Sequence, residues 1–240
     1  MCTARPELLC AHIRSRRRAC GADWIASRGS SRQAVRWIDD ASSDNTSEVA
    51  KSFNIPFIQL AANLGIGGAV QTGFKYAVNN DYDVVVQVDG DGQHDPAWVS
   101  SIIEPISKGE ADCVIGSRYM KEDPDKIYKT PFFRRVGMFF SSTLLFFATG
   151  VFISDTTSGF RSLNRPVFEY FAKEYPVDHP EAESLLMLHR ANFIFIEKPV
   201  RMKGRVAGNS LFTFFNTIMY PFRVLVGFAG ILLRNRENKK

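Results

Sequence analysis

The chain has 240 residues, of which 45% are hydrophobic and 23% charged, and its formal net charge is +5. This length suits one α/β domain with a full core and excludes two large domains. The basic residues are spread along the chain rather than gathered into patches with aromatic residues, so we expect no nucleic acid partner. The four cysteines, at positions 2, 10, 20 and 113, lack metal-site spacing and disulfide-scaffold density, which fits a reducing compartment.

The first segment, residues 1–36, differs in composition from the rest. It is rich in Arg, contains no Lys and shows no sustained helix or strand period. We expect it to be disordered. The alternatives are a basic arm for an acidic surface, a transit-type peptide, or a start that is not part of the genuine protein.

The next segment places two carboxylates at the end of a short strand. An apolar stretch from Trp37 runs into Asp39 and Asp40, and Ser and Asn residues then lead to a helix that begins near Thr46. A strand that ends in two aspartates predicts a ligand-binding loop. Turn and helix-cap chemistry is the alternative interpretation of the same residues.

A glycine cluster follows the second predicted strand, residues 55–60. Gly65, Gly67 and Gly68 precede a helix predicted to run from about residue 69 to 78. Glycines at a helix N-terminus let backbone N–H groups approach phosphates, which makes Gly65 a candidate for a nucleotide-sugar site. The stretch matches neither the P-loop nor G-x-G-x-x-G, and turn or packing roles are the alternative.

The central feature is a strand followed by three oxygen-bearing side chains. Residues 84–88 are almost continuously apolar, as in a strand that is buried on both faces of a parallel sheet. Asp89, Asp91 and Gln93 follow at a spacing of two, which lets them converge beyond the carboxyl end of the strand. Oxygen ligands of this kind suit Mg²⁺ or Mn²⁺. The pattern predicts a site for a metal and a diphosphate.

Three arginines and one further aspartate lie in later parts of the chain, two of the arginines directly after predicted strands. The predicted strand 112–115 brings Arg118 to the same edge, where it could clamp a phosphate; pairing with a carboxylate at the surface is the alternative. A turn-rich segment with Asp155 and Arg161 predicts a site loop. The strand 193–197 leads to a basic loop that begins with Arg201, and we expect this loop to act as a lid.

Two apolar segments predict contact with a membrane. Residues 132–153 are apolar and aromatic, with arginines near the start, which favours a helix in the membrane interface; a buried core helix is the alternative. The segment from Leu211 is apolar except for Asn216 and Arg223, and Pro221 interrupts it. An interfacial or re-entrant segment is favoured over a full span. We expect its cationic tail on the cytoplasmic side.

Six motifs resemble those of family 2 glycosyltransferases with the GT-A fold, and in particular bacterial polysaccharide enzymes and the dolichol-phosphate mannose synthase-like group. In chain order they are WIDDASSDNT, NLGIGGAVQTGFKYA, VVVQVDGDGQHDP, DCVIGSRY, DTTSGFRSLNR and EKPVRM. The resemblance covers about residues 37–205. It implies an α/β fold with a mixed, mainly parallel, Rossmann-like sheet that is flanked by helices, together with apolar membrane-associated helices.

For the sugar donor, the resemblance implies that Asp39 and Asp40 hold the nucleoside. Asp89 and Asp91 would form the DXD pair on Mg²⁺ or Mn²⁺ and the diphosphate, and Gln93 would also serve the metal. These residues define the predicted nucleotide-sugar site.

For the acceptor, the resemblance implies that Asp155 is the catalytic carboxylate. Arg161 and Arg201 would face phosphates on the acceptor side, whereas Arg118 would face a phosphate of the nucleotide sugar and belongs to the nucleotide-sugar site.

One departure from the family pattern concerns the beginning of the domain. Family members start with a strand and a Pro-Ala-Tyr-Asn-Glu-like nucleotide loop, which residues 1–36 do not contain. We therefore expect the first strand to be missing or replaced. The expected organisation is an atypical segment at 1–36, a glycosyltransferase domain at 37–207 and a membrane-associated segment at 208–240.

The expected function is transfer of a sugar from a UDP- or GDP-sugar to a lipid-linked or saccharide acceptor, with polyprenyl phosphate favoured, at the cytoplasmic face of a membrane. The alternative is a non-catalytic, membrane-associated nucleotide-binding remnant whose donor pocket is defective at the N-terminal side.

Overall fold

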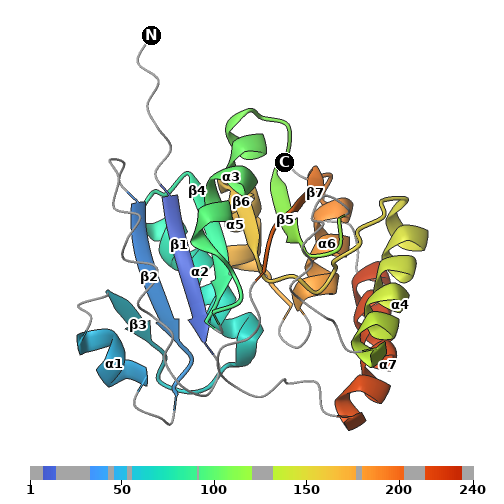
Figure 1. The fold of residues 1–240 in the computed structure, drawn as a ribbon, viewed down its shortest axis with the longest axis horizontal. Coiled ribbons are helices and arrows are strands. Elements are labelled where there is room, and N and C mark those ends of the chain that lie inside the picture. Colours follow the sequence, from blue (N-terminus) through green and yellow to red (C-terminus); the bar gives the residue numbers. More distant parts are fainter. Residues whose placement is uncertain are drawn as a thin grey trace.

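The protein is built around a seven-stranded sheet with the strand order β3-β2-β1-β4-β6-β5-β7 (Figure 1). The computed structural model describes residues 8–14, 33–42, 46–52, 56–90, 92–120, 132–176, 180–202 and 214–233. The strands are β1 (Leu8–Arg14), β2 (Gln33–Asp39), β3 (Phe57–Gln59), β4 (Val84–Asp89), β5 (Cys113–Ser117), β6 (Arg161–Asn164) and β7 (Phe195–Pro199). The strand β6 is antiparallel to both of its neighbours, β4 and β5, and all other pairs are parallel. The predicted mixed, mainly parallel sheet is confirmed.

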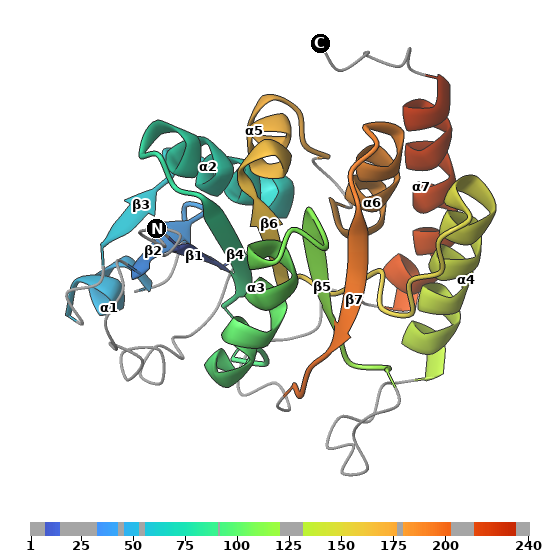
Figure 2. The same cartoon turned by 90° about the horizontal axis from the view of Figure 1, so that it is seen from above.

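Helices cover both faces of this sheet. They are α1 (Thr46–Ser52), α2 (Gly65–Asn79), the 3-10 helix η2 (Pro96–Trp98), α3 (Val99–Ser107), α4 (Phe132–Thr149), α5 (Arg165–Lys173), α6 (Pro180–Arg190) and α7 (Phe214–Leu233). Figure 2 shows α2 and α5 on one side of the strands and α3 on the other. The helices α2 and α5 therefore pack against one apolar face of the sheet and α3 against the other.

The central strand β4 is buried on both faces, as its apolar sequence predicts. Val84, Val86 and Val88 belong to a cluster with Ile102 of α3, whereas Val85 belongs to the larger cluster with α2 and α5. Successive side chains of a strand point to opposite faces, so one apolar run supplies both cores.

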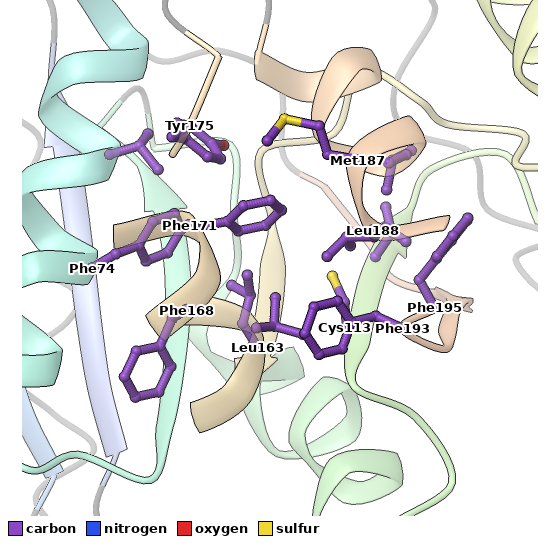
Figure 3. Close-up of a cluster of buried hydrophobic side chains, with 14 of the residues drawn as sticks. Phe74, Cys113, Leu163, Phe168, Phe171, Tyr175, Met187, Leu188, Phe193 and Phe195 are labelled. Atoms are coloured by element: carbon purple, nitrogen blue, oxygen red, sulfur yellow. The ribbon is translucent and has the colours of Figure 1, made fainter. Parts of the chain in front are cut away.

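The larger cluster lies between the sheet and helices α2, α5 and α6 (Figure 3). Phe74 of α2 stacks on Phe171 of α5 at 5.7 Å between ring centroids and meets Tyr175 edge-on at 5.3 Å. Burial raises the pKa of the Cys113 thiol to about 12, so this cysteine is an unreactive core residue.

The strand β1 corrects one prediction about the N-terminal segment. Residues 8–14 lie in the middle of the sheet, paired in parallel with β2 on one side and β4 on the other, and β2 begins at Gln33. The prediction of disorder for residues 1–36 is therefore wrong for 8–14 and 33–36. The sequence of β1, LLCAHIR, is short, does not alternate and has arginine-rich neighbours, so no strand period is visible in it.

The position of the first strand is thus filled, by a strand that the family motifs did not reveal. Its neighbours on both sides satisfy its backbone hydrogen bonds, which stabilises a sequence with little intrinsic strand pattern. The predicted position of the nucleotide loop, after this strand, lies outside the described residues.

The two apolar helices α4 and α7 pack against each other and against α6 at one end of the molecule (Figures 1 and 2). Leu145 of α4 and Val224 and Phe228 of α7 are buried in this packing. The helix α7 continues through Pro221 instead of breaking there. In the described part of the chain, no helix combines the length and the apolarity that a membrane crossing requires.

Candidate functional site

One edge of the sheet collects the predicted site residues that the structure describes. Asp39 and Asp89 lie at the ends of β2 and β4 and are in register with Arg14 and Ile13 of the intervening strand β1. Because β5 and β7 run in the same direction as β4, the residues after them reach this edge as well, and so does the loop that enters the antiparallel strand β6. This is the carboxyl edge, where open α/β sheets bind ligands.

Asp39 is a buried carboxylate that organises the loop after β2. Its Oδ1 accepts a hydrogen bond from the backbone N–H of Ser42 at 3.0 Å, and its Oδ2 accepts one from the hydroxyl of Ser47 at 2.7 Å. The turn chemistry that the sequence allowed is therefore present. It fixes the loop between β2 and α1, and a contact between Asp39 and a nucleoside stays a prediction.

Asp40 lies between the end of β2 and the beginning of α2. Its Oδ1 accepts the backbone N–H of Leu64 at 2.6 Å, while its Oδ2 is buried without a hydrogen-bond partner among the described residues. Burial raises the pKa of the Asp40 carboxyl, and the backbone N–H groups of Leu64 and Gly65 act in the opposite direction. A buried acceptor without a donor is costly, so Oδ2 is a place where a ligand donor would be stabilising.

Gly65 serves the entry into α2. Its φ of +77° lies in the left-handed region, which glycine adopts without strain. The helix starts at Gly65, earlier than the predicted residue 69, and the carboxylate of Asp40 accepts the backbone N–H of Leu64 directly before it. The described contacts of Gly65 thus agree with the turn role, and its part in nucleotide-sugar binding stays a prediction.

Asp89 is seated against the backbone of Gly159. A β-carbon built on Gly159 would lie 2.5 Å from each carboxylate oxygen of Asp89, so a larger residue at this position would displace the carboxylate. The Asp89 side chain is 32% exposed. It is therefore held on one side and open to a ligand on the other.

Two of the three predicted metal ligands, Asp89 and Gln93, lie in the described part of the chain. The donors are oxygens, from the carboxylate of Asp89 and the amide of Gln93, and such donors suit Mg²⁺ or Mn²⁺. Gln93 is buried, and Asp91 lies outside the described residues. In the described ranges, no three His, Cys, Asp or Glu side chains form a group that could hold a metal. The predicted set of Asp89, Asp91 and Gln93 thus stays a prediction.

Arg118 and Asp155 form a buried ion pair. The guanidinium donates from Nε to Oδ2 and from Nη2 to Oδ1 of Asp155, both at 2.7 Å, and the backbone N–H of Arg118 adds a bond of 3.2 Å. The side chains are 5% and 0% exposed. Pairing with a carboxylate, the alternative for Arg118, is therefore observed, although in the interior rather than at the surface. Both carboxylate oxygens of Asp155 are therefore engaged by Arg118.

Glu197 supports this pair from β7, and the sequence interpretation gave it no role. Its Oε1 accepts the backbone N–H of Asp155 at 2.7 Å and its Oε2 accepts that of Ser154 at 2.8 Å. The available signal was an acidic residue within the EKPVRM motif, at the end of a strand that reaches the same edge.

Arg161 and Arg201 have opposite environments. Arg161 is buried and donates to the carbonyl oxygens of Ser158, Thr156 and Glu181 and to the hydroxyl of Ser184. These bonds favour a structural role in joining the site loop to α6 over the predicted contact with a phosphate. Arg201 follows β7 and is exposed. The rest of the predicted lid loop, from Lys203, lies outside the described residues.

Comparison with known families identifies the family to which this chain belongs. The sequence model of glycosyl transferase family 2 matches residues 31–171, more than half of the chain. The chain therefore belongs to glycosyl transferase family 2, as the six motifs indicated.

Characterised relatives include enzymes that are named for lipid phosphates. The chain is 26% identical over 183 residues to the UDP-N-acetylglucosamine–dolichyl-phosphate N-acetylglucosaminyltransferase of Methanococcus voltae, covering 68% of this chain and 72% of the relative. It is 31% identical over 138 residues to the polyprenol monophosphomannose synthase of Mycolicibacterium smegmatis, covering 55% and 51%. An uncharacterised protein of Methanocaldococcus jannaschii is 31% identical over 147 residues, covering 61% and 60%. The chain thus matches about half to three quarters of these relatives' own lengths.

Solved structures confirm the GT-A fold. A mannosyltransferase of Pyrobaculum calidifontis, solved with GDP-Man and Mn²⁺, has a TM-score of 0.63 at 14% identity, covering 99% of this chain and 67% of that one. Glucosyl-3-phosphoglycerate synthase of Mycobacterium tuberculosis, solved with Mn²⁺, UDP-glucose and phosphoglyceric acid, has a TM-score of 0.64 at 14% identity, covering 94% and 79%. At this identity the similarity establishes the fold.

Proposed function

We propose that this protein transfers a sugar from a UDP- or GDP-sugar to a polyprenyl phosphate. The observation that carries the proposal is the convergence of Asp39, Asp40 and Asp89 at the carboxyl edge of a family 2 glycosyltransferase fold. The relatives named for dolichyl phosphate and polyprenol support a lipid phosphate as the acceptor.

On the donor side, the buried oxygens of the β2 loop would receive the nucleoside. Oδ2 of Asp40 is an acceptor without a donor, and an N–H or O–H group of a nucleoside would supply one. Asp89, with Asp91 and Gln93, would hold Mg²⁺ or Mn²⁺, which stabilises the negative charge of a departing nucleoside diphosphate.

On the acceptor side, the ion pair of Asp155 favours a phosphate over a sugar hydroxyl. A hydroxyl nucleophile needs a base, and both oxygens of Asp155 are engaged by Arg118. A lipid phosphate is already anionic near neutral pH and needs no base. The exposed Arg201 at the same edge would attract such an anion.

We also propose that α4 and α7 bind the cytoplasmic surface of a membrane. The outer face of α4 exposes Phe139 (69%) and Phe147 (81%), and the outer face of α7 exposes Phe222 and Leu233. The inner faces of both helices are packed in the protein. Adjacent helices with exposed aromatic and aliphatic stripes are suited to a lipid interface, and an exposed arginine on each would meet anionic headgroups. This surface would bring a lipid acceptor to the site.

The alternative, a non-catalytic remnant, depended on a missing first strand and on a missing nucleotide loop, and the position of that loop lies outside the described residues. Because β1 fills the position of the strand, the reason for expecting a defective sheet is removed. Isothermal titration with UDP and with GDP separates the two functions. We expect one of them to bind in the presence of Mn²⁺, and binding of neither would favour the remnant.

The direct test is transfer of radiolabel from nucleotide sugars to polyprenyl phosphate in the presence of Mn²⁺, with a soluble saccharide offered as the competing acceptor. We expect the label in the lipid-extractable product. Label in the saccharide alone would overturn the choice of acceptor while leaving glycosyl transfer intact.

A further inference from the structure

We infer that His94 is a positioning residue that holds the carboxylate of Asp89 in place for the metal. The inference rests on the proposed role of Asp89 and gives a role to His94, a residue within the motif VVVQVDGDGQHDP for which the sequence predicted none. It follows from the contacts of His94 with Asp89, Phe160 and Met202.

The first contact joins His94 directly to the proposed ligand residue. Nδ1 of His94 accepts the backbone N–H of Asp89 at 3.0 Å. An accepting Nδ1 carries no proton, so the neutral ring has its proton on Nε2, and Nε2 lies 3.8 Å from Oδ2 of Asp89. One side chain therefore accepts the backbone N–H of Asp89 through Nδ1 and places Nε2 3.8 Å from the Asp89 carboxylate.

The second contact fixes the plane of the imidazole. The ring of His94 stacks on Phe160 at 4.9 Å between centroids and 21° between planes, and both residues are buried. Phe160 directly follows Gly159, whose backbone lies against the carboxylate of Asp89. His94 and Gly159 thus both lie beside Asp89, and the stacking of His94 on Phe160 links the two.

The third contact fixes the backbone of His94. A β-bridge pairs His94 with Met202, after β7, so the loop that follows Asp89 is tied to a neighbouring segment of the edge. Residues that orient metal ligands in this way typically contribute about 10- to 100-fold to metal affinity or activity. Three independent supports make His94 suited to that role.

The test compares two substitutions that separate the contacts. His94→Phe keeps an aromatic ring on Phe160 but removes the Nδ1 acceptor, whereas His94→Asn keeps an acceptor oxygen near the position of Nδ1. Mn²⁺ affinity, measured from the electron paramagnetic resonance signal of free Mn²⁺ with UDP or GDP present, reports on the site without turnover. His189→Phe on α6 is the matched control.

We expect His94→Phe to weaken Mn²⁺ binding by about 10- to 100-fold and His94→Asn to restore most of the affinity. Unchanged Mn²⁺ affinity in folded His94→Phe would overturn the inference. If His94→Phe does not fold, His94→Ala and His94→Asn replace the pair, and equal Mn²⁺ affinity of these two would overturn it. A wild-type protein that binds nucleotide but no Mn²⁺ would contradict the proposed metal role itself and the inference with it.

Discussion

The carboxylate of Asp89 lies directly against the backbone of Gly159. A β-carbon at position 159 would lie 2.5 Å from both carboxylate oxygens of Asp89. Gly159→Ala should therefore displace the carboxylate and weaken Mn²⁺ binding by about tenfold or more, with a smaller change in stability. Titration of Mn²⁺ against the folded variant measures this effect.

Gly230→Ala is the control for that substitution. Gly230 lies in α7, and a β-carbon there would meet no atom within 4 Å. We expect wild-type Mn²⁺ affinity and a small gain in helix stability, of up to about 1 kcal/mol. Equal Mn²⁺ affinities for the two alanine variants would show that Gly159 does not shape the site.

Asp40 should make stability depend on pH in a definite direction. Its pKa in the folded protein is raised above the ordinary value of 3.8, mainly by burial, so the folded state binds the proton more tightly than the unfolded state. The free energy of unfolding therefore falls as pH rises from about 3.8 through the folded pKa, and the cost persists at neutral pH.

Asp40→Asn should remove this cost and keep an acceptor for the N–H of Leu64. We expect the stability advantage of the variant over wild type to grow as pH rises through that window, together with weaker binding of UDP or GDP. Urea unfolding between pH 4 and 8 and isothermal titration measure the two effects. A constant stability difference across this range would contradict the assignment of the titrating group to Asp40.

The ion pair between Arg118 and Asp155 should behave as a coupled unit. Removing one partner leaves the other buried and unpaired, which typically costs about 3–5 kcal/mol. We expect Arg118→Ala and Asp155→Ala each to be strongly destabilising and the double variant to cost much less than their sum. Urea unfolding of the wild type, the two single variants and the double variant gives the coupling free energy between Arg118 and Asp155. Additive effects of the two substitutions would show that the pair is not an energetic unit.

Arg201 should act on the acceptor alone. It is exposed, so Arg201→Ala should change stability by no more than about 0.5 kcal/mol. We expect a higher KM for polyprenyl phosphate and an unchanged affinity for the nucleotide, with Lys75→Ala on the exposed side of α2 as the control. A rise in the KM of the nucleotide sugar would contradict this role and would indicate that Arg201 binds the donor.

The apolar surface of α4 should determine binding to vesicles. Burial of a phenylalanine side chain in an apolar phase contributes about 1.5–3 kcal/mol, so Phe147→Glu should reduce partitioning to anionic vesicles by at least about tenfold. Ile194→Glu is the control, since Ile194 is also exposed but lies between α6 and β7, outside α4 and α7. Flotation of both variants gives the comparison, and equal partitioning would exclude α4 from the membrane surface.

The sequence predicted the parts of the fold that rest on strong periodicity and motif order. The apolar run of β4 indicated a strand buried on both faces, and its position fixed the edge at which Asp39, Asp89 and Arg118 meet. Strand β1 was missed because it is short and does not alternate, and because its position depends on hydrogen bonds to β2 and β4 that are distant in sequence.

The sequence did not predict which side chains pair with each other in the folded protein. The motifs brought Arg118, Asp155 and Arg161 to one edge but could not distinguish a guanidinium that faces a ligand from one that is paired inside the protein. The roles of Glu197 and His94 likewise depend on contacts between segments, which spacing along the chain does not encode.

Transfer of sugar to polyprenyl phosphate compared with the same lipid lacking the phosphate is the most direct measurement of the proposed function. With Mn²⁺ and a radiolabelled UDP- or GDP-sugar, we predict label in the phosphorylated lipid, no label in the free polyprenol, and loss of transfer in the Asp89→Ala, Asp91→Ala double variant. Equal labelling of both lipids, or equal transfer by the wild type and the double variant, would contradict the proposed acceptor or the proposed metal role, respectively.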